Sequence, residues 1–493
     1  MSGEVLILIV LAIPLLTAAG IFLLDGVPDL RESVTIGGAT ALFLAVIALA
    51  STIEGGVGPE RELLQAAPGF VFAFKLEPLG ALFALVASGL WIVNSFYSIG
   101  YMRGNRERNQ TRFYICFAIA LFGAMGVAMS GNLFTLFVFY EVLTLSTYPL
   151  VAHKGDAAAQ RGARIYLLTL LGTSIGLFLV GVVWTSSLAG SLDFVPGGLL
   201  DGKISPSEGS ILLLLFAFGI GKAALMPFHF WLPNAMVAPT PVSALLHAVA
   251  VVKAGVFTVL KIAIFIFGAD LLTEIPATDW VLGVACFTII VASLIAITKD
   301  NLKARLAYST VAQLAYVTAG AMLATSAGFM GGALQIAAHA AGKITLFMCA
   351  GAIYVATGKT EISDMRGLGQ RMPLIFVAFL IGSLSIIGVP PLAGAWPKFA
   401  LMQGAGLSEG HGYVVWVLIV SSLLNVAYLL PIPILALMAP KGTPEPAPYK
   451  REGGAPALTV LPPVFTAGLC LVLFFAMGLV GDFLTPITTT PAT

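Results

Sequence analysis

Long apolar runs recur along the whole 493-residue chain, and each is about as long as a bilayer is thick. A membrane-spanning helix needs about 20 mostly apolar residues, whereas a membrane β-strand alternates apolar and polar residues. The runs here are unbroken. Of all residues 58% are apolar and only 10% are charged, against about 25% charged in a soluble domain. The sequence therefore predicts an all-α polytopic membrane protein and argues against a soluble enzyme, a nucleic-acid binder or a disordered scaffold.

The apolar runs predict about fourteen spans, separated by short polar connections. The predicted ranges are 4–24, 33–53, 77–101, 113–129, 132–152, 164–188, 209–232, 242–267, 279–298, 302–325, 328–357, 374–407, 412–439 and 456–480. No hydrophilic segment is long enough to form a separate soluble domain. Four cysteines lie in four different runs, a spacing that fits neither a metal site nor a disulfide framework.

Basic residues give an independent check on the number of spans. When the connections are numbered in chain order, the even-numbered ones carry only Arg61, Lys75 and Lys203. The odd-numbered ones carry Arg31, Arg103, Arg106, Arg108, Arg112, Lys154, Arg161, Arg164, Lys299, Lys303, Arg305, Lys359, Arg366, Arg371, Lys441, Lys450 and Arg451. Positive residues accumulate in cytoplasmic loops. We therefore expect the odd connections in the cytoplasm and both termini outside.

The remaining basic residues are lysines inside predicted spans. They are Lys222, Lys253, Lys261, Lys343 and Lys398, joined in the spans by Glu141, His229, His247 and His339. A charge at mid-bilayer costs at least about 2.5–3.5 kcal/mol, so such residues usually face a polar interior. A buried lysine can lose and regain a proton when a neighbour moves, whereas arginine stays protonated. The pattern predicts a buried proton path, with structural ion pairing as the alternative for each residue.

The spacing of these residues predicts some of their neighbours. His339 and Lys343 are four residues apart and share a helix face. His247 and Lys253 are six apart, so we expect them to contact different neighbours. Lys261 lies near the outer end of its span, and we expect it to snorkel toward the surface.

Two of the predicted spans are interrupted by glycine and proline. Pro227 and Pro233 follow Lys222 in the seventh span, while Pro390 and Pro391 precede Lys398 in the twelfth. Proline frees backbone carbonyls, which are tolerated in a membrane only where they line protein or water. Interrupted helices in matching halves are the best pointer in a sequence to an ion path.

Four segments of the chain carry a family resemblance. They are PFHFWLPNAMVAPTPVSALLHAVAVVKAGVF at 227–257, LAYSTVAQLAY at 306–316, HAAGKITLFMCAG at 339–351, and the stretch at 388–398. The chain resembles the antiporter-like subunits shared by Mrp-type Na⁺/H⁺ antiporters, proton-pumping NADH:quinone oxidoreductase and membrane-bound hydrogenases. Its length is similar to the D-type Mrp subunit, while residues 231–257 look closer to the A-type.

The resemblance implies an inverted repeat of five helices, formed by spans 4–8 and 9–13 with broken helices 7 and 12. The units would be residues 1–112, 113–267, 279–439 and 456–480. It also implies roles in proton transfer for Glu141, Lys222, His247, Lys253, His339, Lys343 and Lys398. In that interpretation Glu141 pairs with Lys222, and protons pass from the His247 region along the row to Lys398.

The sequence thus predicts an ion-translocating subunit of a multi-subunit Na⁺/H⁺ antiporter in a prokaryotic cell membrane. It predicts a transporter subunit rather than an enzyme, without metal or cofactor, whose partners are other membrane subunits, H⁺ and Na⁺. The alternative is the proton-pumping subunit of an NADH:quinone oxidoreductase or hydrogenase complex. A lipid-modifying enzyme or a passive anchor fits less well, because no polar catalytic cluster is present and an anchor gains nothing from buried lysines.

Overall fold

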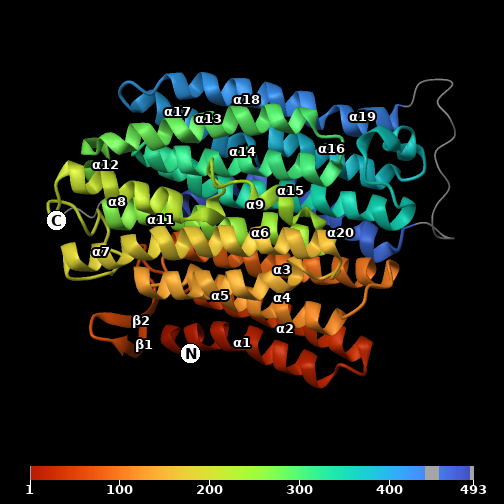
Figure 1. Cartoon of the computed structure of the whole chain (residues 1–493), viewed down its shortest axis with the longest axis horizontal. Coiled ribbons are helices and arrows are strands. Elements are labelled where there is room, and N and C mark those ends of the chain that lie inside the picture. Colours follow the sequence, from red (N-terminus) through yellow and green to blue (C-terminus); the bar gives the residue numbers. More distant parts are fainter. Residues whose placement is uncertain (1, 439–454, 489–493) are drawn as a thin grey trace.

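The computed structural model describes residues 2–438 and 455–488, so Lys441, Lys450 and Arg451 lie outside the described residues. The molecule is a bundle of helices whose axes run roughly parallel (Figure 1). Eleven helices in the described part are long and apolar enough to cross a membrane. Every predicted range overlaps a helix or a broken helix, while the count of fourteen spans stays a prediction.

The N-terminal part contains five long helices and one β-hairpin. The elements are α1 (Gly3–Leu23), α2 (Pro28–Ala50), β1 (Glu60–Ala67), β2 (Phe70–Lys75), α3 (Pro78–Gly104), α4 (Gln110–Ala128) and α5 (Leu133–Val151). The hairpin forms in a segment that the sequence pattern assigns to a polar connection. Phe72 and Phe74 alternate along β2 and pack on Phe134 and Phe139 of α5, which explains the extended structure there.

The middle of the chain is more irregular than the ends. Its helices are α6 (Ala157–Thr173), α7 (Leu179–Ala189), α8 (Pro206–Gly219), α9 (Trp231–Asn234), α10 (Thr240–Ala244), α11 (Val251–Ile262) and α12 (Ala269–Glu274). π-Helical turns at Leu245–Val249 and Ala263–Phe267 continue α10 and α11 into one apolar stretch, Thr240–Phe267, which is entirely buried.

The C-terminal part contains the remaining long helices. They are α13 (Pro276–Thr298), α14 (Leu302–Met322), α15 (Ser326–Thr357), α16 (Pro373–Ile387), α17 (Ala395–Leu407), α18 (Tyr413–Leu429), α19 (Pro431–Leu437) and α20 (Ala457–Leu484). The 32-residue α15 is enclosed by α14, α16, α17 and α20. It also contacts α11, and these two buried helices form the centre of the bundle (Figure 1).

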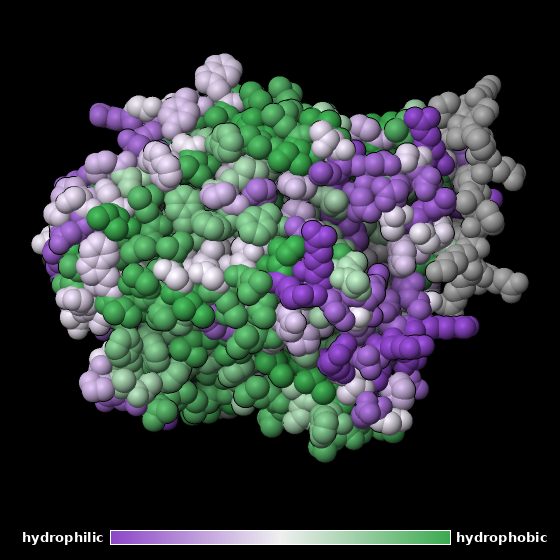
Figure 2. Space-filling view, viewed as in Figure 1, coloured by the Kyte–Doolittle hydropathy of each residue, from purple (hydrophilic) through white to green (hydrophobic). Residues whose placement is uncertain are grey.

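The surface follows the same organisation. In Figure 2 apolar residues cover most of the visible face, and hydrophilic residues gather toward one end of the helices. Only 22% of the apolar window of α20 and 28% of that of α2 are buried within the chain. Polar groups therefore belong to the helix ends and the interior, and the outer helices present apolar side chains, as a lipid-facing surface requires.

Candidate proton-transfer site

Lys222 lies in a gap in the seventh predicted span. Helix α8 ends at Gly219, a single 3₁₀ turn follows, and Ala224 has a left-handed φ of 53°. Pro227 supplies no N–H, so the chain cannot resume a helix at once. The indole of Trp231 instead donates to the free carbonyl of Gly221 at 2.9 Å. The break places Lys222 within the bundle, where it is fully buried.

Helix α5 holds the Lys222 ammonium through neutral groups. Its Nζ donates to the backbone carbonyl of Tyr140 at 2.8 Å and to the hydroxyl of Thr144 at 2.6 Å. The Tyr140 ring centroid is 3.1 Å from the same Nζ, so the ring also stabilises a positive charge. Sequence reasoning missed Tyr140 and Thr144, although both lie within one turn of Glu141.

Glu141 follows Tyr140 but does not form the direct contact with Lys222 that the sequence predicts. Both of its carboxylate oxygens are buried and make no hydrogen bond to the described residues. The carboxylate still interacts electrostatically with Lys222. The reason is geometric: the carbonyl and the hydroxyl of α5 already occupy the lysine's donors, and the acid stands beside them.

The centre of the bundle brings together two predicted residues from distant parts of the chain. Lys253 on α11 places its Nζ 2.6 Å from Nδ1 of His339 on α15, and both side chains are buried. At that distance an amine and an imidazole can share one proton. Nε2 of His339 has no partner among the described residues, which leaves this nitrogen open for a second proton contact.

His247 lies in the π-helical turn before α11 and faces a different neighbour from Lys253, as its spacing predicted. Its ring centroid is 4.4 Å from that of Phe347 on α15. Neither ring nitrogen makes a hydrogen bond within the described part of the chain.

Lys343 shares α15 with His339 but contacts α14. Its Nζ donates to the hydroxyl of Ser309 at 2.6 Å and to the carbonyl of Leu306 at 3.2 Å. Ser309 in turn accepts a hydrogen bond of 2.9 Å from Tyr428 of α18. The helix face shared by His339 and Lys343 therefore serves two separate clusters.

Lys398 lies in the second broken span. Helix α16 ends at Ile387, Gly388 has a φ of 90°, and Pro390 and Pro391 occupy the gap before α17. The Nζ of Lys398 donates to the carbonyl of Ile387 at 2.6 Å and to the hydroxyl of Ser422 at 2.8 Å. A carbonyl at the end of a helix is a good partner for a cation. The break thus supplies one of the two acceptors.

Lys261 does not snorkel, so that expectation is wrong. Its side chain is 1% exposed, and its Nζ lies 2.9 Å from Oε1 of Glu77 at the start of α3. Glu77 stands at the end of a predicted span, so the sequence pattern marks only Glu141 as a deep acid. The pairing joins residues 184 positions apart, so no local pattern could reveal it.

The structure therefore holds the predicted residues in four local clusters rather than in one continuous row. Within the described part of the chain, no direct hydrogen bond links the clusters of Lys222, Lys253, Lys343 and Lys398 to one another. In the same part of the chain, no three His, Cys, Asp or Glu side chains are grouped to hold a metal ion.

Fold and site together define a polytopic helical membrane protein of the antiporter-like class. The chain belongs to the NADH:quinone oxidoreductase/Mrp antiporter family, whose transmembrane family model matches residues 130–425. The resemblance seen in the sequence is thereby confirmed.

Relatives come from both branches of this family. The chain is 34% identical over 454 residues to NADH-quinone oxidoreductase subunit N of Desulforudis audaxviator, covering 90% of this chain and 88% of the relative. It is 31% identical over 486 residues to the A1 subunit of a Na⁺/H⁺ antiporter of Staphylococcus haemolyticus, where it covers 92% of this chain but only 58% of the relative.

Solved structures show the same fold. A chain of the Mrp complex from Dietzia sp. superposes with a TM-score of 0.86 at 22% identity, covering 99% of this chain and 97% of that one. A chain of an archaeal membrane-bound sulfane sulfur reductase superposes with a TM-score of 0.83 at 24% identity, covering 97% and 96%.

Proposed function

We propose that the chain is the ion-translocating subunit of a multi-subunit monovalent cation/proton antiporter, in which Na⁺ is exchanged for H⁺. The observation that carries the proposal is the way four buried lysines are held. Lys222, Lys343 and Lys398 donate to carbonyl and hydroxyl oxygens, and Lys253 faces an imidazole. None of these four touches a carboxylate within the described residues. A buried ammonium with neutral partners gives up its proton more easily than one locked to an acid.

In this proposal protons enter near His247 and pass through Lys253, His339 and Lys343 to Lys398. The unpaired ring nitrogens of His247 and His339 support the first part of the path, because a neutral imidazole nitrogen can accept a proton. Glu141 acts on Lys222 through space. When the carboxylate approaches, Lys222 holds its proton more firmly, and when it withdraws, the proton is released. The titration then belongs to the coupled groups rather than to single residues.

The proposed setting is a cell membrane, with both termini outside and with other membrane subunits as partners. The division of the helices into two five-helix repeats remains part of the proposal. So does exchange for Na⁺, which rests on the printed activity of the Staphylococcus relative and on the A/B subunit of a K⁺/H⁺ antiporter of Rhizobium meliloti, 33% identical over 334 residues.

A second candidate is the proton-pumping subunit of a quinone-reducing complex. It is favoured by the NADH-quinone oxidoreductase subunit N relative, which the chain covers over 88% of its length. Any redox centre would then lie in partner subunits.

One experiment separates the two. The complex that contains this chain is assayed in everted vesicles, where a preformed pH gradient is followed by fluorescence. Collapse of the gradient on adding Na⁺ or K⁺, and its loss in Lys398→Ala vesicles, supports the antiporter. A gradient formed only by electron transfer to quinone, with no response to either cation, replaces it with the second candidate. An unchanged response in Lys398→Ala vesicles contradicts the proposed path.

A further inference from the structure

The ion pair of Lys261 and Glu77 differs from every other intramembrane lysine site described above, because here the lysine does meet a carboxylate. The ammonium also donates to the backbone carbonyl of Ser130 at 2.7 Å. Its Nζ lies 4.5 Å from the Phe194 ring centroid and 5.4 Å from that of Phe257. Lys261 is therefore surrounded by a complete set of groups that stabilise a cation.

A cavity of about 100 Å³ lies directly beside this cluster. Glu77, Ser130 and Phe194, which all contact the Lys261 ammonium, also line the cavity. The side chain of Lys261 is 1% exposed and that of Glu77 is 12% exposed. Glu77 therefore stands between a buried ammonium and space that can hold about three water molecules.

The cavity opens on the face that the distribution of basic residues predicts to be outside. Its walls come from the connections before α3, between α4 and α5, and after α7, together with residues that follow α20. Two further charged groups belong to this region. Lys75 lines the cavity, and its ammonium is paired with Glu60 at 3.1 Å.

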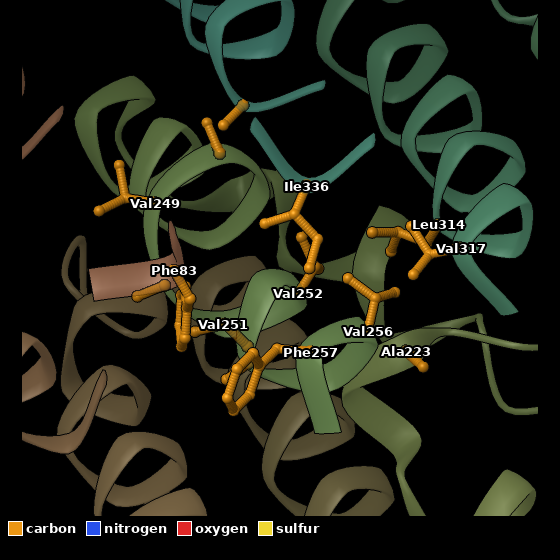
Figure 3. Packing of buried hydrophobic residues seen from close by; sticks show 14 of the residues in the cluster. Phe83, Ala223, Val249, Val251, Val252, Val256, Phe257, Leu314, Val317 and Ile336 are labelled. Carbon is orange, nitrogen blue, oxygen red and sulfur yellow. The ribbon is translucent and has the colours of Figure 1, made fainter. Parts of the chain in front are cut away.

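An apolar barrier separates this cluster from the central pair. Lys253 and Lys261 lie on the same helix, eight residues or about 12 Å apart along its axis. Phe257 lies between them and packs on Phe83 of α3, with ring centroids 5.1 Å apart. Both rings are fully buried in the apolar cluster of Figure 3. Such constrictions block ions and protons while they stay dry.

We propose that Lys261 and Glu77 form a proton-exchange station on the outer side of the N-terminal half, closed from Lys253 by the Phe83–Phe257 barrier. This rests on the proposed function only in taking the chain to move protons. In the exchange step an N–H bond of the Lys261 ammonium breaks and an O–H bond forms on Glu77, leaving a neutral amine and a neutral acid. Glu77 then releases that proton to water in the cavity. Lys261 regains a proton from Lys253 when the barrier is wetted.

The test uses a double variant, Glu77→Gln with Lys261→Gln, in the intact complex in everted vesicles. The two amides keep the length and the hydrogen bonding of the pair, and no charge is left without a partner. We expect normal assembly and a fall in transport of about tenfold or more. Glu4→Gln with Arg61→Gln removes an exposed pair on the same face, joined at 2.8 Å, and should leave transport unchanged.

A second measurement tests access from outside and does not depend on the double variant folding. Val57 lines the cavity and is 65% exposed. In right-side-out vesicles, a membrane-impermeant cationic thiol reagent should inhibit transport by Val57→Cys. It should spare Glu62→Cys, which lies on the exposed strand of the hairpin away from the cavity, and the unsubstituted chain.

Lys398→Ala is included to separate two failures. Wild-type transport by an assembled double variant, with Lys398→Ala inactive, overturns the station and leaves the proposed function intact. Wild-type transport by Lys398→Ala overturns the proposed function itself. If the double variant does not assemble, full transport by reagent-treated Val57→Cys overturns the station.

Discussion

Lys222 and Lys398 occupy the two broken spans, and their surroundings can be compared group by group. Each ammonium donates to one backbone carbonyl and one hydroxyl. Each also lies near a tyrosine ring: Tyr140 at 3.1 Å from the first and Tyr316 at 5.4 Å from the second. The same chemistry therefore holds a buried cation twice, although the partners come from different elements.

The two sites differ in the acid. Tyr140 is followed by Glu141, whereas Tyr316 is followed by Val317. Glu141 acts on Lys222 without touching it, and Lys398 has no comparable carboxylate among its contacts. A helix break with neutral acceptors is thus sufficient to bury a lysine. We infer that the acid in the first half adds control over when the proton is released.

The largest effect is expected from removing either lysine. Lys222→Ala and Lys398→Ala should each lower transport by about 100-fold or more, because no neighbouring group can replace a proton carrier. Transport is measured in everted vesicles, with subunit content checked by immunoblot. Lys203→Ala, in an exposed connection, is the control and should retain transport. If one lysine variant stays active, the two sites are not equivalent.

Glu141→Gln should produce the next largest effect, about tenfold. The amide keeps the size of the side chain but cannot attract the Lys222 ammonium, so the modulation of proton release is lost. Glu274→Gln, an exposed acid at the end of α12, serves as the control. Undiminished transport by Glu141→Gln would remove the difference drawn between the two halves.

A smaller effect is expected from the two hydroxyls. Thr144→Val and Ser422→Ala each delete one acceptor of a buried ammonium, a hydrogen bond to a charged group that contributes about 1.5–3 kcal/mol. Since the backbone carbonyls remain, we expect a several-fold loss, shown by a changed pH profile of transport. Thr185→Val, whose hydroxyl bonds only to Gly181 of its own helix, should not shift that profile. Unequal shifts would show which site depends more on its hydroxyl.

The smallest effect concerns the end of α5, the helix that carries Tyr140 and Glu141. Burial, followed by the nearby Arg112, lowers the pKa of His153 to about 4. The unfolded chain, with a pKa near 6.5, binds the proton first. Stability is therefore full above about pH 6.5 and falls as the pH drops toward 4, by on the order of 1 kcal/mol.

His153→Gln should flatten this dependence in thermal unfolding of the purified complex between pH 7.5 and 5. An equal slope in wild type and variant would exclude His153 as its source. Helix α14, which carries Tyr316, ends at Met322 without a histidine beside it. The effect would therefore distinguish the two halves.

The helices and the buried charges could be predicted from the sequence, because both depend on local composition. A run of about 20 apolar residues forms a helix in lipid wherever it occurs, and a lysine within it must face the interior. The breaks at Lys222 and Lys398 were visible in the same way, through Pro227, Pro390 and Pro391. His247 and Lys253 have different neighbours, as their spacing alone indicated.

The partners of those charges could not be predicted, because they come from other helices. Thr144 is 78 residues from Lys222, and His339 is 86 residues from Lys253. Lys261 illustrates the error that follows: its place near a span end suggested snorkelling, yet Glu77 and Ser130 reach it from two other elements.

By itself, then, the sequence determined that this chain spans a membrane many times and carries ionisable groups inside it, since hydrophobic burial and backbone hydrogen bonding act over single segments. Only the tertiary structure decided which groups meet. It separated Glu141 from direct contact with Lys222, joined Lys253 to His339, and gave Lys261 its carboxylate. The physical reason is that a hydrogen bond or an ion pair is set within fractions of an ångström, and that precision arises from helix packing rather than from the order of residues along any one helix.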